Sequence, residues 1–123
     1  MELPSGFAAF QPYILPVAAV GYLVYRNMKY KRVKCQLPQL IKDGAQLVDV
    51  RSPEEFSSGS CPGSLNIPLD SLGARAGELD KEKTLILCCA SGARSGIAAG
   101  MLKRQGFKNV INAGPWQNTL QND

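Results

Sequence analysis

The stretch that most constrains this chain covers residues 84–105, where an apolar segment, a loop of small residues and a helix-like segment follow one another. Residues 84–88 form a short apolar run, which predicts a buried strand. Residues 95–105 have the pattern of a helix, and Gly106 follows as a C-terminal stop signal. The sequence therefore predicts that Cys89 lies where a strand ends and where a short loop opens a helix.

The loop between these two elements reads Cys89, Ala90, Ser91, Gly92, Ala93 and Arg94. Small residues allow consecutive backbone N–H groups to converge on one point and to form an anion-binding concavity. The positive end of the helix dipole and the Arg94 guanidinium add to the same field. A thiol in this position is expected to ionise easily, because all of these groups stabilise the thiolate. We expect Gly92 to meet a need for positive φ or for close approach.

The rest of the chain alternates between strand and helix patterns. Short apolar runs predict strands at residues 46–50, 65–67 and 109–112, and helices are expected from Pro53, from Asp70 to about residue 79, and near residues 116–120. This alternation is typical of an α/β fold with a mostly parallel central sheet flanked by helices. Ligand sites in such folds lie at the carboxyl ends of strands, which is where Cys89 is expected.

The loop resembles the active-site loop C-x-x-G-x-R of the rhodanese (sulfurtransferase) superfamily. Three further blocks resemble that family in the same order, at residues 47–56, 58–68 and 106–114, so the resemblance covers roughly residues 36–121. It implies a sulfurtransferase in which Cys89 takes sulfane sulfur from thiosulfate or a persulfide donor. Cys89 would then pass the sulfur to a thiol or cyanide acceptor through a covalent persulfide. No cofactor and no metal ion are implied.

The resemblance also assigns roles to other residues. Asp49 and Arg51 match the family's D-V-R signature and are expected to brace the loops at the edge of the sheet. Arg94 either contacts an anionic donor or turns inward to hold the loop through a carboxylate. The family's usual histidine and aliphatic residue are replaced here by Ser60 and Cys61. Cys61 is then either a second, resolving thiol or a small packing residue.

Three other functions fit parts of this pattern. Related phosphatases of the same fold have a loop one residue longer, so the six-residue loop favours sulfur transfer over phosphate chemistry. A persulfide carrier that delivers sulfur to a protein partner would keep the same loop. A non-enzymatic binding module at a membrane would not need the cysteine, which is present here. The sequence itself identifies no protein partner.

The N-terminal segment is unusual because residues 6–25 contain no charged side chain. A helix of that length would be about 30 Å long, which matches a bilayer core. Three interpretations compete: a single-pass transmembrane helix, a cleaved signal peptide, and a buried or peripheral helix. The signal peptide is disfavoured because only Glu2 precedes the apolar run. We expect the membrane helix, and so a lipid bilayer as a partner.

Charge and cysteine usage complete the prediction. Five basic residues follow the apolar run at positions 26–34, whereas residues 35–123 carry nine Lys or Arg against nine Asp or Glu. This asymmetry predicts an N-terminus outside the membrane and a cytoplasmic domain, and it disfavours nucleic-acid binding. We therefore divide the chain into a membrane helix with a basic linker (residues 1–34) and a rhodanese-like domain (residues 35–123). The four cysteines have no zinc-site spacing.

Overall fold

Four parallel strands form the centre of the molecule. The computed structural model describes residues 5–120, with side chains from residue 12 onward. The strand order is β2-β1-β3-β4, with β1 at Gln46–Asp49, β2 at Leu65–Asn66, β3 at Leu85–Cys89 and β4 at Val110–Pro115. Strand β3 lies between β1 and β4, where all five of its residues are buried. All the carboxyl ends therefore meet at one edge, and Cys89 lies there.

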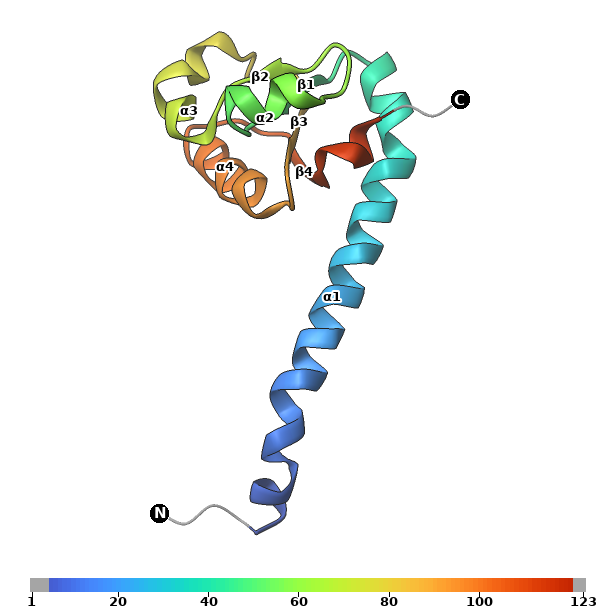
Figure 1. Cartoon of the computed structure of the whole chain (residues 1–123). Coiled ribbons are helices and arrows are strands. Elements are labelled where there is room, and N and C mark those ends of the chain that lie inside the picture. Colours follow the sequence, from blue (N-terminus) through green and yellow to red (C-terminus); the bar gives the residue numbers. More distant parts are fainter. Residues whose placement is uncertain (1–4, 121–123) are drawn as a thin grey trace.

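Helices cover both faces of this sheet (Figure 1). They are α1 (Ser5–Lys42), α2 (Pro53–Ser58), α3 (Leu69–Arg75) and α4 (Ala93–Arg104), with short 3-10 helices at Ala76–Glu78 (η1) and Trp116–Thr119 (η2). The predicted α/β fold with a parallel sheet flanked by helices is confirmed. Helix α3 begins at Leu69, with Pro68 at the N-cap position, whereas the sequence predicts the start at Asp70.

Successive residues of β3 point to opposite faces of the sheet and supply two separate cores. Leu85, Leu87 and Cys89 lie in the core with α3 and α4, which also contains Leu72 and Leu102. Ile86 lies on the other face, in a second core with Val33 and Leu37 of α1. The C-terminal half of α1 is thus one of the layers that bury the sheet (Figure 1).

The prediction of a membrane anchor in the N-terminal half of α1 is wrong. Among residues 12–120, whose side chains the structure describes, no helix combines the length and the apolar character needed to cross a bilayer. The physical reason is that the stretch is uncharged without being strongly apolar, since prolines and tyrosines interrupt it and Arg26 follows in the same helix.

The membrane-dependent predictions are therefore wrong. They are the transmembrane helix at about residues 6–25, the outside N-terminus with a cytoplasmic domain, and the contact with a lipid bilayer. The first residues of that segment, up to position 11, lie outside those whose side chains are described. Residues 26–34, expected to form a linker, are part of α1.

Candidate active site

Cys89 lies at the end of β3, enclosed by the loop that leads into α4. Its side chain is 0% exposed. The backbone N–H of Gly92 donates to Cys89 Sγ at 2.9 Å, and that of Ser95 donates at 3.4 Å. Gly92 is the N-cap of α4 with φ 99°, so the loop turns back toward the cysteine through a left-handed conformation. The predicted cradle of N–H groups is thus built around one sulfur atom at a helix N-terminus.

This cradle stabilises the thiolate. Burial raises the pKa of Cys89, but hydrogen bonds from the Ser95 hydroxyl and from the backbone of Ser95, Gly92 and Ser91 outweigh burial and lower the pKa below its ordinary value. The neighbouring Cys88 shows the opposite behaviour, because its burial and the charge of Asp49 raise the pKa of its thiol. Of these two adjacent cysteines, only Cys89 therefore has the ionisation expected of a nucleophile.

Two polar side chains hold the cradle in place from α4 and β4. Ser95 Oγ lies 3.3 Å from Cys89 Sγ and donates to Asn112 Oδ1 at 2.6 Å. Asn112 also accepts from the Gly114 N–H at 2.9 Å and donates to the Gly92 carbonyl at 3.2 Å. The Ser95 hydroxyl has one proton, which it can donate to Asn112 Oδ1 or to Cys89 Sγ. Ionisation of Cys89 favours rotation of this O–H group toward the sulfur. Asn112 thus links the cysteine loop to the neighbouring strand.

Arg94 is held by a carboxylate. Its two terminal nitrogens donate to Glu55 Oε1 and Oε2 at 2.7 and 2.9 Å. Glu55 also closes a capping box with Ser52 at the start of α2. The hydrogen bond from Arg94, followed by that from the Ser52 backbone, lowers the pKa of Glu55 to about 2. Arg94 therefore pins the loop to α2, which is the inward of the two orientations expected from the sequence.

Asp49 and Arg51 form a buried pair beside the site. Arg51 donates to both carboxylate oxygens of Asp49 at 2.7–3.0 Å, and the two residues are 4% and 0% exposed. Arg51 also donates to the carbonyls of Glu55 and Gly59, and Trp116 covers it at 4.8 Å. The guanidinium thereby ties β1 to α2 and to the loop that follows it.

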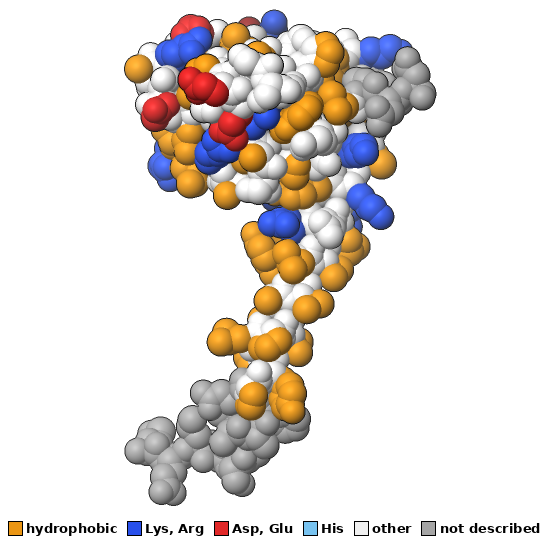
Figure 2. Space-filling view, in the orientation of Figure 1, with side chains coloured by type: hydrophobic (Ala, Val, Ile, Leu, Met, Phe, Trp, Pro, Cys, Tyr) orange, Lys and Arg blue, Asp and Glu red, His pale blue; other side chains and the backbone are white. Residues whose placement is uncertain are grey.

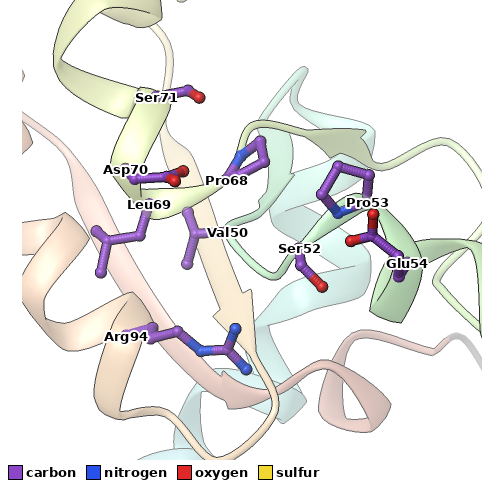
Figure 3. A pocket seen from close by; sticks show the side chains of 9 residues that line it. All are labelled: Val50, Ser52, Pro53, Glu54, Pro68, Leu69, Asp70, Ser71 and Arg94. Carbon is purple, nitrogen blue, oxygen red and sulfur yellow. The ribbon is translucent and has the colours of Figure 1, made fainter.

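Two cavities flank the cysteine loop. The larger, about 680 Å³, lies between α2, α3 and the start of α4; Arg94 lies on one side of it, and Ser52, Glu54 and Asp70 lie on the others (Figure 3). The second, about 430 Å³, lies between α1 and α4 and reaches Gly92, Ala93 and Asn112. Both cavities approach the site from the carboxyl edge of the sheet.

Comparison with known proteins decides the family. The family described as Rhodanese-like domain matches residues 35–114 of this chain. This protein belongs to the rhodanese-like family. The resemblance seen in the sequence is thereby confirmed for the domain, although not for a membrane anchor.

The relatives of this rhodanese-like protein include sulfurtransferases and a putative sulfur carrier. It is 36% identical over 85 residues to the thiosulfate sulfurtransferase GlpE of Pseudomonas syringae, covering 68% of this chain and 80% of GlpE. It is 41% identical to the putative sulfur carrier protein YrkF of Bacillus subtilis over 59% of this chain, but spans only 40% of YrkF. The human single-domain sulfurtransferase TSTD1 superposes with a TM-score of 0.60 at 30% identity, over 68% of this chain and 88% of TSTD1.

Cys61, where this rhodanese-like domain departs from the family pattern, lies away from Cys89. It belongs to the core on the α1 side of the sheet, whereas Cys89 belongs to the core on the α4 side. Its Sγ donates to the Thr119 carbonyl at 3.3 Å. All four cysteines are free thiols. The two thiols are thus placed in different clusters, and a resolving role for Cys61 stays a prediction.

Three contributors to the site escaped the sequence analysis: Ser95, Asn112 and Glu55. Ser95 had a signal, since it is a hydroxyl residue in the first turn after the cysteine loop. Asn112 and Glu55 had no specific sequence signal. Asn112 lies 17 residues from Ser95, and Glu55 lies 39 residues from Arg94, the partners that they contact at the site. Only the pairing of β3 with β4 and the packing of α2 against the loop bring them to the rhodanese-like site.

Replacing Ser95 tests the origin of the lowered pKa. In Ser95→Ala the hydroxyl that stabilises the charged sulfur is lost, so we expect Cys89 to ionise at higher pH and to hold about tenfold less thiolate below its midpoint. Thiolate absorbance measured against pH, with Cys89→Ser as background, gives the midpoint directly. Ser91→Ala is the matched control, because it keeps the backbone N–H and changes only an exposed side chain. Equal midpoints in Ser95→Ala and the wild type would contradict the assignment.

Proposed function

We propose that this protein is a sulfurtransferase that carries sulfane sulfur on Cys89 as a persulfide. The observation that supports it most directly is the set of N–H groups directed at one buried sulfur, with the start of α4 behind it. The same donors that stabilise the thiolate would stabilise the charged outer sulfur of a persulfide. The loop Ala90, Ser91, Gly92, Ala93 and Arg94 is the proposed binding cradle, with Asp49 and Arg51 as its supports.

The first step loads the cysteine. The Cys89 thiolate attacks the outer sulfur of thiosulfate, and a new S–S bond forms while the S–S bond of the donor breaks. Sulfite leaves with the bonding electron pair, so the negative charges balance and no proton is required. A general base is unnecessary because the lowered pKa already supplies the thiolate. A chain without histidine is compatible with this chemistry.

The second step unloads the cysteine. A thiolate or cyanide attacks the outer sulfur of the persulfide, the S–S bond breaks, and its electron pair returns to Cys89 as the thiolate. The loop donors again receive the charge. Donor and acceptor are thus used in turn at one sulfur atom, which is the double-displacement pattern of covalent catalysis.

A persulfide carrier is the second candidate. The complete burial of Cys89 favours it, because a protected persulfide survives until a partner opens access to it. The similarity to a putative sulfur carrier agrees with this. A carrier should load at least about tenfold faster in a single turnover than it turns over thiosulfate and cyanide in steady state, since its natural acceptor is missing. Equal rates would favour the enzyme.

The function is tested by the mass of the intact chain after brief exposure to thiosulfate. We expect a gain of one sulfur atom, located by peptide mapping on the segment that contains Cys89, and released by cyanide as thiocyanate. Loading should continue at pH values below the ordinary range of a cysteine thiol, because the pKa of Cys89 is lowered. If reduced protein gains no sulfur from thiosulfate or from a small-molecule persulfide, the proposal is wrong.

A further inference from the structure

The middle of α1 lies across the cysteine loop. The Tyr30 ring packs on Gly114, where an added Cβ would lie 2.6 Å from Tyr30 Cζ, and the Tyr30 hydroxyl lies against Gly92. Gly92 is the residue whose N–H donates to Cys89 Sγ. Gly92 and Cys89 are both buried. Helix α1 therefore covers the cradle, and anything that reaches the sulfur from this side passes Tyr30.

The cavity between α1 and α4 leads to this position. Arg26, Lys29 and Tyr30 line it on the side of α1. Gly92, Ala93 and Asn112 line it on the side of the cysteine loop and β4. Its volume of about 430 Å³ is ample for a small sulfur-containing anion. Figure 2 shows Lys and Arg side chains gathered where α1 leaves the rounded domain.

The charges available to an anion differ between the two sides of the loop. Arg94 and Arg51 are both neutralised by carboxylates, Glu55 and Asp49. Among the described residues, Arg26 and Lys29 form no ion pair. Arg26 Nε is buried and has no hydrogen-bond partner among the described residues.

The two cavities also differ in their carboxylates. The larger cavity is lined by Glu54 and Asp70, whereas no described carboxylate lines the cavity between α1 and α4. An anion is therefore favoured on the α1 side.

Tyr30 is equipped to donate a hydrogen bond in this cavity. Burial raises the pKa of its phenol more than the nearby Arg26 lowers it, and the charges of Tyr22 and Cys89 raise it further. The phenol is therefore neutral at physiological pH and keeps its proton. The Arg26 guanidinium lies 5.9 Å from the centre of the Tyr30 ring, so the cation and the phenol line the same side of this cavity.

We infer that Arg26, Lys29 and Tyr30 form the wall that binds the anionic sulfur donor, with its oxyanion end held by Arg26 and Lys29 and its outer sulfur directed past Tyr30 toward Cys89. This inference rests on the proposed function, because it names the donor subsite of that same reaction. The three residues precede the segment 35–114 that matches the family. The wall is thus a feature of this chain's own N-terminal helix. As sulfite leaves, the charge that develops on it would face these donors.

Binding of thiosulfate to the full-length Cys89→Ser chain tests the wall without requiring transfer. The affinity for thiosulfate is measured by calorimetric titration at low ionic strength. Adding Arg26→Gln to the Cys89→Ser chain should lower this affinity about tenfold, as expected for the loss of one charge-assisted contact. Arg26→Lys should retain most of the affinity. Lys31→Gln, an exposed charge on the same helix that does not line the cavity, is the matched control and should change it less than about twofold. Circular dichroism checks that each variant is folded.

The outcomes separate this inference from the proposed function. If Cys89→Ser binds no thiosulfate, or if Arg26→Gln binds as well as Lys31→Gln, the donor wall is wrong. Binding that depends on Arg26, with no sulfur loaded on the wild-type chain, would support the wall and overturn the transfer step. In a chain that loads, Arg26→Gln should raise the thiosulfate concentration for half-maximal loading more than it lowers the maximal rate.

Discussion

Replacing Cys89 by serine is expected to abolish sulfur loading, with a rate at least about a thousandfold below that of the wild type. Serine is close to cysteine in shape and its oxygen can accept from the same N–H groups, so we expect the cradle from Gly92 and Ser95 to remain. The hydroxyl, however, has no sulfur with which to form a persulfide, and it does not ionise at neutral pH. Intact mass after exposure to thiosulfate, together with thiocyanate release on addition of cyanide, measures the loss.

The other cysteines provide the controls for this result. Cys35→Ser changes an exposed thiol and should load like the wild type. Cys61→Ala removes the buried thiol on the other face of the sheet, and it should also load fully if Cys61 only packs. A loss of loading in Cys61→Ala, with the fold intact, would support a second thiol in the reaction. Full loading of Cys89→Ser would place the persulfide elsewhere.

Removing the charge of Asp49 should cause the largest loss of stability among single changes at the site. In Asp49→Asn the Arg51 guanidinium stays buried without a carboxylate, and breaking a buried pair in this way costs about 3–5 kcal/mol. Asparagine has nearly the same shape as aspartate, so the effect reports the lost charge and not a cavity. The free energy of unfolding is measured from urea denaturation at neutral pH, with the slope of the transition compared between variants.

An exposed ion pair in the same molecule calibrates this prediction. Glu78 pairs with Arg75 at 2.8 Å on the surface of the domain, and Glu78→Gln should leave the urea midpoint unchanged within error. A shift for Asp49→Asn as small as that for Glu78→Gln would mean that the buried pair does not brace the fold. Cys89 loading, measured under conditions where Asp49→Asn is folded, then shows whether the pair also supports the loop.

Much of this protein could be predicted from sequence because the decisive signals are local. A buried strand, a loop of small residues and a helix are encoded within residues 84–105, and their order alone places Cys89 at a helix N-terminus. Pro53 likewise predicted the start of α2, where Ser52 forms a capping box with Glu55. The helix starts and the loop depend on hydrogen bonds between near neighbours, and the buried strand is marked by a short run of apolar residues, so the sequence pattern reports each of them directly.

The N-terminal helix could not be placed in the same way. An uncharged stretch is compatible with a bilayer, with a core or with exposure, and its charge pattern alone does not distinguish them. The structure shows that Val33 and Leu37 enter the core and that Tyr30 reaches the cysteine loop. The hydropathy of the 38 residues of α1 does not indicate which turn of the helix packs against which loop of the domain. The prediction of a membrane anchor failed because a stretch without charge is not necessarily apolar enough to cross a bilayer.

The sequence by itself determined the α/β alternation, the position of Cys89 and the cradle of small residues around it, because each is marked by a residue pattern within a short stretch of chain. Only the tertiary structure decided which carboxylate holds Arg94, which side chains position the sulfur, and which cations remain free to meet an anion. Glu55, Asn112 and Arg26 lie far from Cys89 along the chain. Their roles arise from the packing of α2, β4 and α1 around β3, and long-range packing depends on the whole fold.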